Sequence, residues 1–147
     1  MTGIPFETTL HVRDTCLCLA TQRAARALAR RFDDAFRPLD LTNGQFSLLM
    51  ALNRAKPPSI APLADFLAMD RTTLTAALKP LERRKLISVS VDPDDRRGRL
   101  LRLTAKGRTL LAKALPIWKA HHAQLDRQIG PAGDLRGHLT MLARPPA

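Results

Sequence analysis

Residues 69–107, which read MDRTTLTAALKPLERRKLISVSVDPDDRRGRLLRLTAKG, decide the fold of this chain. Leu74, Leu78 and Leu81 recur at the spacing of one helix face, so this part is predicted to form a helix with a single apolar stripe. The opposite face carries Thr72, Ala76, Lys79 and Arg83. A helix of this kind fits the major groove of duplex DNA, where threonine and lysine side chains reach base edges and phosphates.

A polar hairpin is predicted directly after this helix. Apolar residues alternate with serines over residues 87–91 and flank Arg102 on the return run, a pattern typical of two antiparallel strands. The tip between them, residues 92–98, consists of turn-forming residues and carries two adjacent arginines. Because a narrow minor groove attracts arginine side chains, the hairpin is predicted to provide a second contact with the duplex.

Four consecutive motifs in residues 70–107 carry a family resemblance. They read Asp-Arg-Thr-Thr-Leu-Thr, Leu-Glu-Arg-Arg-x-Leu-Ile, Asp-Pro-Asp-Asp-Arg-Arg and Leu-Thr-x-Lys-Gly. Together with LTNGQFSLLMAL at 41–52, PLADFLAMD at 62–70 and the Ala-x-Pro-x-Trp pattern at 114–118, they resemble the MarR family of winged-helix transcriptional regulators in order and spacing. The resemblance extends from about Val12 to Leu142.

The resemblance implies a mainly α fold with a small β-hairpin wing. Residues 40–103 would form the winged helix-turn-helix, and residues 9–38 and 104–145 would form a helical dimerisation region. It further implies a homodimer that binds double-stranded DNA at a pseudo-palindromic operator. Such a dimer is expected to act as a repressor that a small-molecule or oxidative signal releases from DNA.

The candidate DNA contacts follow from the helix, the hairpin tip and the family pattern. They are Ser59, Arg71, Thr72, Thr73, Thr75, Lys79, Asp95, Arg96 and Arg97. In the family, the acidic residue of the wing pairs with the tip arginine two positions later. Asp95 is therefore expected to orient Arg97 for the minor groove.

Two residues of the recognition segment depart from the family. Ala76 stands where many relatives place an arginine or another long polar side chain, so a base contact is lost or is replaced by a contact with a thymine methyl group. Pro80 removes the amide that would bond to the Ala76 carbonyl and is expected to bend the helix after its DNA-facing half.

The composition favours one DNA-binding domain with helical extensions. The 147 residues suit one core, and the formal net charge is +11; residues 71–108 alone hold 11 basic and four acidic residues, a net +7. Neither a signal peptide nor an apolar run long enough for a membrane span is seen, which predicts a cytoplasmic protein. No catalytic motif indicates an enzyme. The alternative is a basic RNA-binding or protein-interaction winged helix, which the low aromatic content of 4% disfavours.

Two long amphipathic segments surround the winged helix. Residues 9–36 are predicted to form one helix whose apolar seam comprises Leu17, Ala20, Ala24, Leu28 and Phe32. A second long helix begins at Thr104, is expected to kink at Pro116, and is followed by a short amphipathic piece. Because one copy offers little core for both helices, the pattern favours an obligate homodimer.

Local hydrogen-bonding residues mark the predicted helix starts. Thr42 and Gln45 form a capping-box pattern. Ser59 is the predicted N-cap of the following short helix, and Asp70 is the predicted N-cap of the recognition helix.

The signal that releases DNA has two candidate sites. Cys18 lies 24 residues before Thr42, the spacing at which the organic-hydroperoxide-sensing branch of the family places its reactive cysteine, so Cys18, with Cys16, is a redox candidate. Against this role, the chain lacks the tyrosines of that branch, and cysteine on an apolar face is most often inert. The other candidate is a small aromatic or lipophilic anion in a cleft lined by Phe32 and Trp118, which the family resemblance implies.

Metal ions and cofactors are not expected. His121 and His122 are adjacent on a helix, so their side chains point about 100° apart and cannot chelate one ion together. Solvated or interface histidines are the favoured interpretation.

Overall fold

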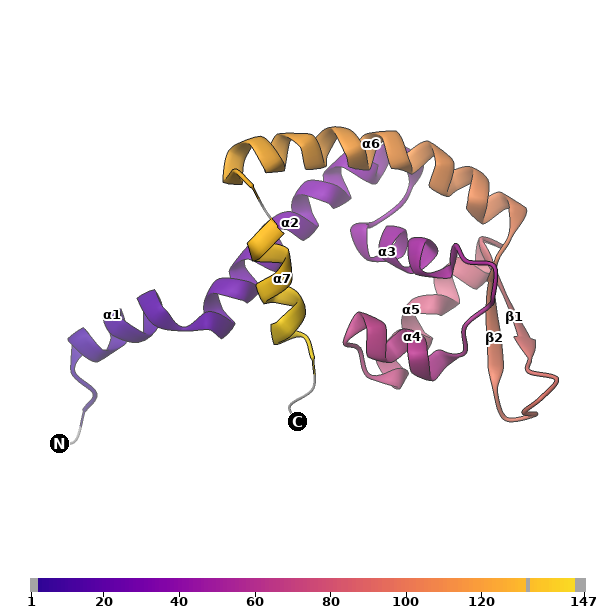
Figure 1. Cartoon of the computed structure of the whole chain (residues 1–147), viewed down its shortest axis with the longest axis horizontal. Helices are drawn as coiled ribbons and strands as arrows, with labels where there is room; N and C mark the ends of the chain where they lie inside the picture. Colours follow the sequence, from indigo (N-terminus) through magenta and orange to yellow (C-terminus); the bar gives the residue numbers. More distant parts are fainter. Residues whose placement is uncertain (1–2, 132, 145–147) are drawn as a thin grey trace.

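The computed structural model describes residues 3–131 and 133–144 (Figure 1). The chain begins with helices α1 (Phe6–Thr15) and α2 (Leu17–Phe36), a 3-10 turn η1 (Arg37–Leu39), and helices α3 (Asn43–Leu52), α4 (Ile60–Leu67) and α5 (Arg71–Arg83). An antiparallel hairpin of β1 (Ile87–Val91) and β2 (Arg99–Leu103) follows, and then come α6 (Ala105–Ile129) and α7 (Gly133–Leu142). This architecture confirms the predicted mainly α fold with a small hairpin wing.

The core lies where the two long helices meet the winged helix. Helices α2 and α6 cross above α3, while α4, α5 and the hairpin lie below it (Figure 1). The largest fully buried side chains come from all of these layers: Phe36, Leu49, Leu63, Leu74, Leu81, Leu86 and Leu101. Each stabilises the fold by about 1.5–3 kcal/mol, so the hairpin and α5 are held firmly against the scaffold.

The predicted single helix over residues 9–36 is wrong, because the chain breaks at Cys16. That residue has extended backbone angles, with ψ 109°, and its Sγ accepts a hydrogen bond from the Leu19 amide at 3.4 Å. Just before it, the Thr15 hydroxyl donates to the His11 carbonyl at 2.7 Å. Two local bonds between side chain and backbone thus end one helix and begin the next.

The other helix starts match the sequence pattern. The Thr42 and Gln45 capping box is present in full, and Asp70 and Thr104 each cap the helix that follows. Ser59 is the N-cap residue of α4, as predicted, but its side chain makes no capping hydrogen bond. The Ser59 backbone instead forms a bridge with Leu100 of the wing, which fixes the residue from the other side.

Neither internal proline ends its helix. Helix α6 continues from Ala105 to Ile129 through Pro116, and α5 continues through Pro80. Figure 1 shows α6 as one arched helix, so Pro116, where we expect a kink, does not break the helix. The missing proline amide removes one bond of the helical ladder, and the neighbouring bonds keep the helix intact.

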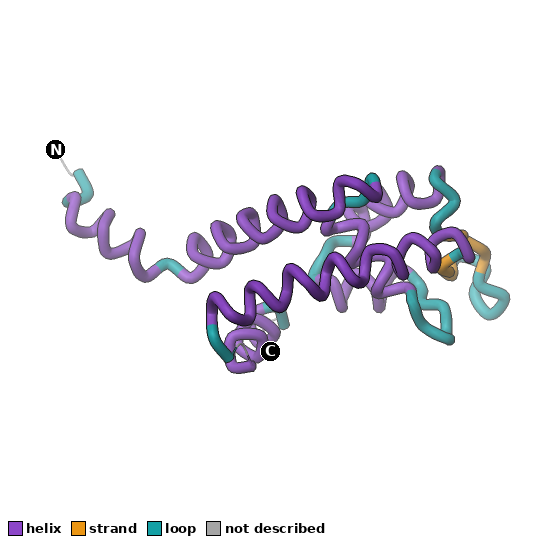
Figure 2. The backbone as a smooth tube through the Cα atoms, turned by 90° about the horizontal axis from the view of Figure 1, so that it is seen from above, coloured by secondary structure: helices purple, strands orange, loops and turns teal. Residues whose placement is uncertain are grey.

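The outer helices leave apolar side chains uncovered. Neither α1 nor α7 contains a buried residue, and α1 extends away from the body beyond the start of α2 (Figure 2). The large exposed apolar residues on these outer segments, on α2 and at the end of α6 are Ile4, Phe6, Val12, Leu17, Leu28, Ile129, Leu135, Leu139, Met141 and Leu142. Residue 145, the end of the predicted dimerisation region, lies outside the described residues.

No helix within residues 3–131 and 133–144 combines the length and the apolar character that crossing a membrane requires.

Candidate nucleic-acid interface

Helix α5 turns its leucines inward and its polar face outward. Leu74 and Leu81 are fully buried and Leu78 is nearly so, as the leucine spacing predicts. The residues on the opposite side are all exposed: Arg71, Thr72, Thr73, Thr75, Ala76 and Lys79. The buried stripe therefore fixes which side of α5 faces solvent, and that side carries the predicted DNA contacts.

The threonines of α5 divide into two groups by their hydrogen bonds. Thr73 donates its hydroxyl to the Asp70 carboxylate at 2.6 Å, and Thr75 donates to the Arg71 carbonyl at 2.8 Å. Both hydroxyls keep lone pairs that can accept a bond but have committed their protons. Within the described residues, Thr72 and Lys79 make no side-chain hydrogen bond, so their donors are available to a ligand.

Asp70 anchors the start of this helix. Its carboxylate also accepts from the Thr73 amide at 2.8 Å. The side-chain bond from Thr73, followed by the bond from the Thr73 amide, holds the pKa of Asp70 below its ordinary value. Since ionised Asp70 is favoured in the folded protein, this stabilisation is present at neutral pH and is lost as the pH falls through the lowered pKa.

Replacing Asp70 by asparagine is expected to flatten the acid limb of the stability profile. Asparagine still caps the helix but cannot titrate. In thermal melts below about pH 5, the wild-type protein should lose more stability than Asp70→Asn as the pH is lowered. Parallel losses in the two proteins would show that the Asp70 carboxylate does not contribute in this way.

The wing tip is ordered by its own aspartates. Asp92 accepts from the Asp94 amide at 2.9 Å, and the Gly98 amide donates to the Asp95 carbonyl at 2.8 Å. The Asp95 carboxylate accepts from the backbone amide of Arg97 at 3.0 Å, in the manner of an Asx turn. The family pattern led us to expect a pair with the Arg97 guanidinium; among the described contacts the carboxylate shapes the turn instead.

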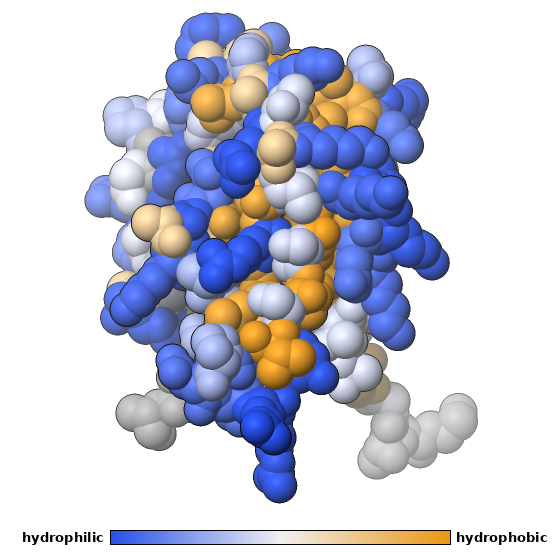
Figure 3. Space-filling model, turned by 90° about the vertical axis from the view of Figure 1, so that its right-hand side faces the viewer, coloured by the Kyte–Doolittle hydropathy of each residue, from blue (hydrophilic) through white to orange (hydrophobic). Residues whose placement is uncertain are grey.

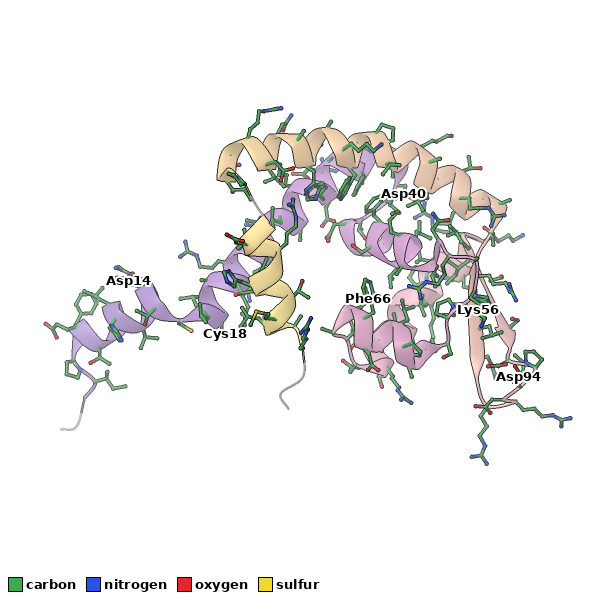
Figure 4. The ribbon with its side chains drawn as sticks, in the orientation of Figure 1. Asp14, Cys18, Asp40, Lys56, Phe66 and Asp94 are labelled. Carbon is green, nitrogen blue, oxygen red and sulfur yellow. The ribbon has the colours of Figure 1, made fainter. Side chains whose placement is uncertain are left out.

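Arg96 and Arg97 extend from this turn into solvent. Both residues are exposed, and Figure 4 shows long nitrogen-ended side chains projecting from the tip near Asp94. No charged side chain is buried within residues 3–131 and 133–144, so the basic residues there lie on the surface. Seen from the wing side, hydrophilic side chains surround a narrow apolar band (Figure 3). This surface is suited to a polyanion.

An apolar groove lies between α3, α4 and α6. It has a volume of about 630 Å³ and is lined by Phe46, Ser47, Met50, Ala51, Arg54, Phe66, Leu67, Leu115 and Trp118. Trp118, one of the two predicted effector-site aromatic residues, lines this groove. Phe32, the other one, is buried against Phe36 and the two histidines and does not line this groove.

The sequence did not single out the other groove residues. Phe66 is 72% exposed although it belongs to an otherwise apolar helix, and it turns toward the space beside α3 (Figure 4). Its exposure depends on how α4 packs, which no local pattern reveals. The only feature of the sequence that could have indicated Phe66 as a groove residue is that it is an aromatic residue outside the leucine spacing of its helix.

The two histidines pack with aromatic residues. His122 lies over Trp118 with ring centroids 4.2 Å apart, and its pKa is lowered by burial and then by Arg136. Within the described residues, no group of three or more His, Cys, Asp or Glu side chains could hold a metal ion.

The two cysteines lie at the joint between α1 and α2. Cys16 is half-buried and caps α2, whereas Cys18 is exposed and its Sγ accepts from the Gln22 side-chain amide at 3.1 Å. Neither cysteine lines the groove beside Trp118.

Known proteins similar to this chain share both the fold and the motifs. The MarR family model matches residues 41–98, from α3 to the wing tip. The transcriptional regulator MosR of M. tuberculosis, solved in complex with DNA, is 37% identical; the match covers 87% of this chain and 93% of MosR with a TM-score of 0.81. The repressor CouR, solved with p-coumaroyl-CoA, is 29% identical; the match covers 90% of this chain and 92% of CouR with a TM-score of 0.74.

A further relative matches mainly over the winged helix. The repressor NicR of Pseudomonas putida is 38% identical over 76 residues, which are 52% of this chain and 48% of NicR. This chain therefore matches about half the length of that curated relative. On the winged-helix architecture, the exposed polar face of α5 and these similarities, the chain belongs to the MarR family of DNA-binding transcriptional regulators, which are not enzymes.

Proposed function

We propose that this protein is a cytoplasmic transcriptional repressor that binds a pseudo-palindromic operator as a homodimer. The observation that carries the proposal is the orientation of α5, which buries its leucines and presents Arg71, Thr72 and Lys79 on the same molecule as an arginine-tipped wing. Helix α5 would enter the major groove, and the wing would reach the adjacent minor groove. The repressor names of CouR and NicR support the direction of regulation.

The contacts on α5 have different roles in this proposal. Arg71 and Lys79 would neutralise phosphates and position the helix, while Thr72 would contact a base edge. Ala76 would offer its methyl group to a thymine. Thr73 and Thr75, whose protons are committed within the protein, would act as acceptors. Ser59, at the start of α4, would contact a phosphate.

The uncovered apolar faces of α1 and α7 support a homodimer. A helix with no buried residue covers little apolar surface against its own chain, and these two helices carry exposed Phe6, Val12, Leu135 and Leu139. Covering such a surface with a second copy removes it from water. A two-fold dimer would place two copies of α5 on successive major grooves, which requires an inverted repeat in the operator.

Replacing Arg97 by alanine is expected to weaken operator binding by about ten- to a hundredfold, because each dimer loses two minor-groove arginines. The loss should be similar for different DNA sequences, since the wing reads groove shape rather than base identity. A gel-shift titration measures it, with Lys113→Ala on the exposed side of α6 as the control. Unchanged affinity of Arg97→Ala, with a normal melting curve, would contradict the assignment.

The groove beside Trp118 is our candidate site for the releasing signal. Its apolar lining suits an aromatic or lipophilic body, and Arg54 supplies a cation for an acidic group. The binding of p-coumaroyl-CoA by the similar protein CouR supports this class of effector. An occupant there would contact α3, α4 and α6 together, and so would bias the position of the recognition helix relative to the long helices.

A second candidate signal is the oxidation of Cys18 by a peroxide. The thiol is exposed, and the joint at which it lies is the single break in the long N-terminal helical segment. The thiolate would attack the peroxide, its O–O bond would break, and sulfenic acid and water or an alcohol would form. Mass spectrometry after mild peroxide treatment should show added oxygen on Cys18 before Cys16; an unmodified Cys18 beside an oxidised accessible control thiol would remove this candidate.

A further inference from the structure

A small polar pocket lies where the base of the wing meets the loop between α3 and α4 and the start of α6. Its volume is about 190 Å³, and it shares Arg54 with the groove beside Trp118. Nine residues line it: Leu52, Asn53, Arg54, Ala55, Pro57, Leu101, Arg102, Leu103 and Arg108. The loop after α3, strand β2 and the start of α6 therefore contribute one arginine each.

The charge of this pocket is not balanced by nearby acidic residues in the sequence. No aspartate or glutamate occurs between residues 41 and 64 or between residues 96 and 125, the two stretches that form its walls. Within the described residues, Arg54, Arg102 and Arg108 also form no ion pair. The three arginines that line this pocket are exposed, so an anion from solvent can reach them.

Two of the three guanidinium groups are already held in place. Arg54 donates its Nε proton to the Ala51 carbonyl at 2.9 Å, and Arg108 donates from Nη1 to the Leu103 carbonyl at 2.9 Å. Each arginine has five N–H donors, so most of them remain available after these bonds form. Anchored arginines lose little side-chain entropy when they bind a ligand, which favours binding.

We propose that Arg54, Arg102 and Arg108 form a binding site for a phosphate group. The tetrahedral oxygens of phosphate match several guanidinium donors at once, and the side-chain amide of Asn53 adds a further donor. The same chemistry would accept a free phosphate-bearing anion or a phosphate of the DNA backbone. None of the four residues belongs to the recognition helix or to the wing tip, so the site does not depend on the proposed operator contacts.

An occupant of this site would add a link between the base of the wing and the scaffold, beside the Ser59–Leu100 bridge and the bond from Arg108 to the Leu103 carbonyl. Arg102 belongs to β2, where it pairs with Ser88 of β1, whereas Arg54 and Arg108 belong to the scaffold. Bridging them would hold the base of the wing in one position. If the wing contacts DNA, occupancy and operator affinity are then linked.

The test begins without DNA, with titrations of inorganic phosphate and of sodium chloride at equal ionic strength into the wild-type protein. Calorimetry is expected to detect a phosphate-specific site. Arg102→Gln should weaken phosphate binding about tenfold, the effect of losing one charge-assisted contact. Lys113→Gln, which removes an exposed cation of α6 outside the pocket, should leave phosphate binding unchanged.

A second experiment, the titration of duplex DNA in phosphate-free buffer at several salt concentrations, identifies the source of the phosphate. If the DNA backbone supplies it, Arg102→Gln should reduce the salt dependence of duplex binding by about one unit per site. If a free anion supplies it, that slope should equal the wild-type slope. The proposed phosphate site would be contradicted if phosphate bound no more tightly than chloride. It would also be contradicted if Lys113→Gln lowered the phosphate affinity as much as Arg102→Gln. Failure of the proposed function would instead appear as wild-type protein that does not bind duplex DNA.

Discussion

Replacing Gly107 by alanine is expected to lower the free energy of unfolding by about 3 kcal/mol. Gly107 lies in the first turn of α6, where an added Cβ would overlap the Leu86 carbonyl oxygen and lie 2.8 Å from the Leu103 side chain. The Leu86 oxygen cannot move away at small cost, because it accepts from both the amide and the hydroxyl of Thr104. The substitution should therefore loosen the junction between the wing and α6.

A matched substitution separates this clash from the general effect of glycine in helices. Gly44 also lies in the first turn of a helix, but the nearest atom to its added Cβ is 4.0 Å away. Gly44→Ala should be neutral or stabilising by up to about 1 kcal/mol. Chemical denaturation of the two variants beside the wild-type protein measures the difference. Equal stabilities of Gly107→Ala and Gly44→Ala would show that α6 does not pack against Leu86 as described.

The double variant Leu135→Asp, Leu139→Asp is expected to be monomeric and to bind the operator at least about a hundredfold more weakly. Both leucines are about half exposed on α7, so the charges should not disturb the core of the single chain. They would instead be buried without partners at the proposed interface. Without the dimer, the second half-site no longer benefits from a high effective concentration.

Sedimentation measures the oligomeric state of this variant, and titrations with a full operator and a half-site measure its DNA binding. Thr109→Asp adds a charge to an exposed position of α6 and serves as the control. The double variant should bind the full operator and the half-site with nearly equal affinity. A stable dimer that retains the wild-type preference for the full operator would exclude α7 from the interface.

The sequence predicts the parts of this fold that depend on local patterns. The spacing of Leu74, Leu78 and Leu81 determines the inner face of α5, because a helix repeats every 3.6 residues. The caps at Thr42 and Asp70 are likewise local, since each side chain bonds to an amide three residues later.

The features that the sequence did not predict depend on competition between alternative hydrogen bonds or on tertiary packing. The break at Cys16 arises because local side-chain bonds outweigh helix continuity in a segment without buried residues. The Asp95 carboxylate accepts from the backbone amide of Arg97 and not from its guanidinium, because fewer covalent bonds separate the amide from Asp95. The arginine pocket at the wing base joins residues 54, 102 and 108, and only the folded chain brings them together.

Selection of bound DNA from a pool of random duplexes tests the central claim most directly. The account predicts that the wild-type protein enriches an inverted repeat whose half-site centres lie about 10 base pairs apart. It also predicts that single-stranded RNA does not displace the selected duplex. Enrichment of sequences without two-fold symmetry, or displacement of the duplex by RNA, would contradict the proposal that this protein is a dimeric operator-binding repressor.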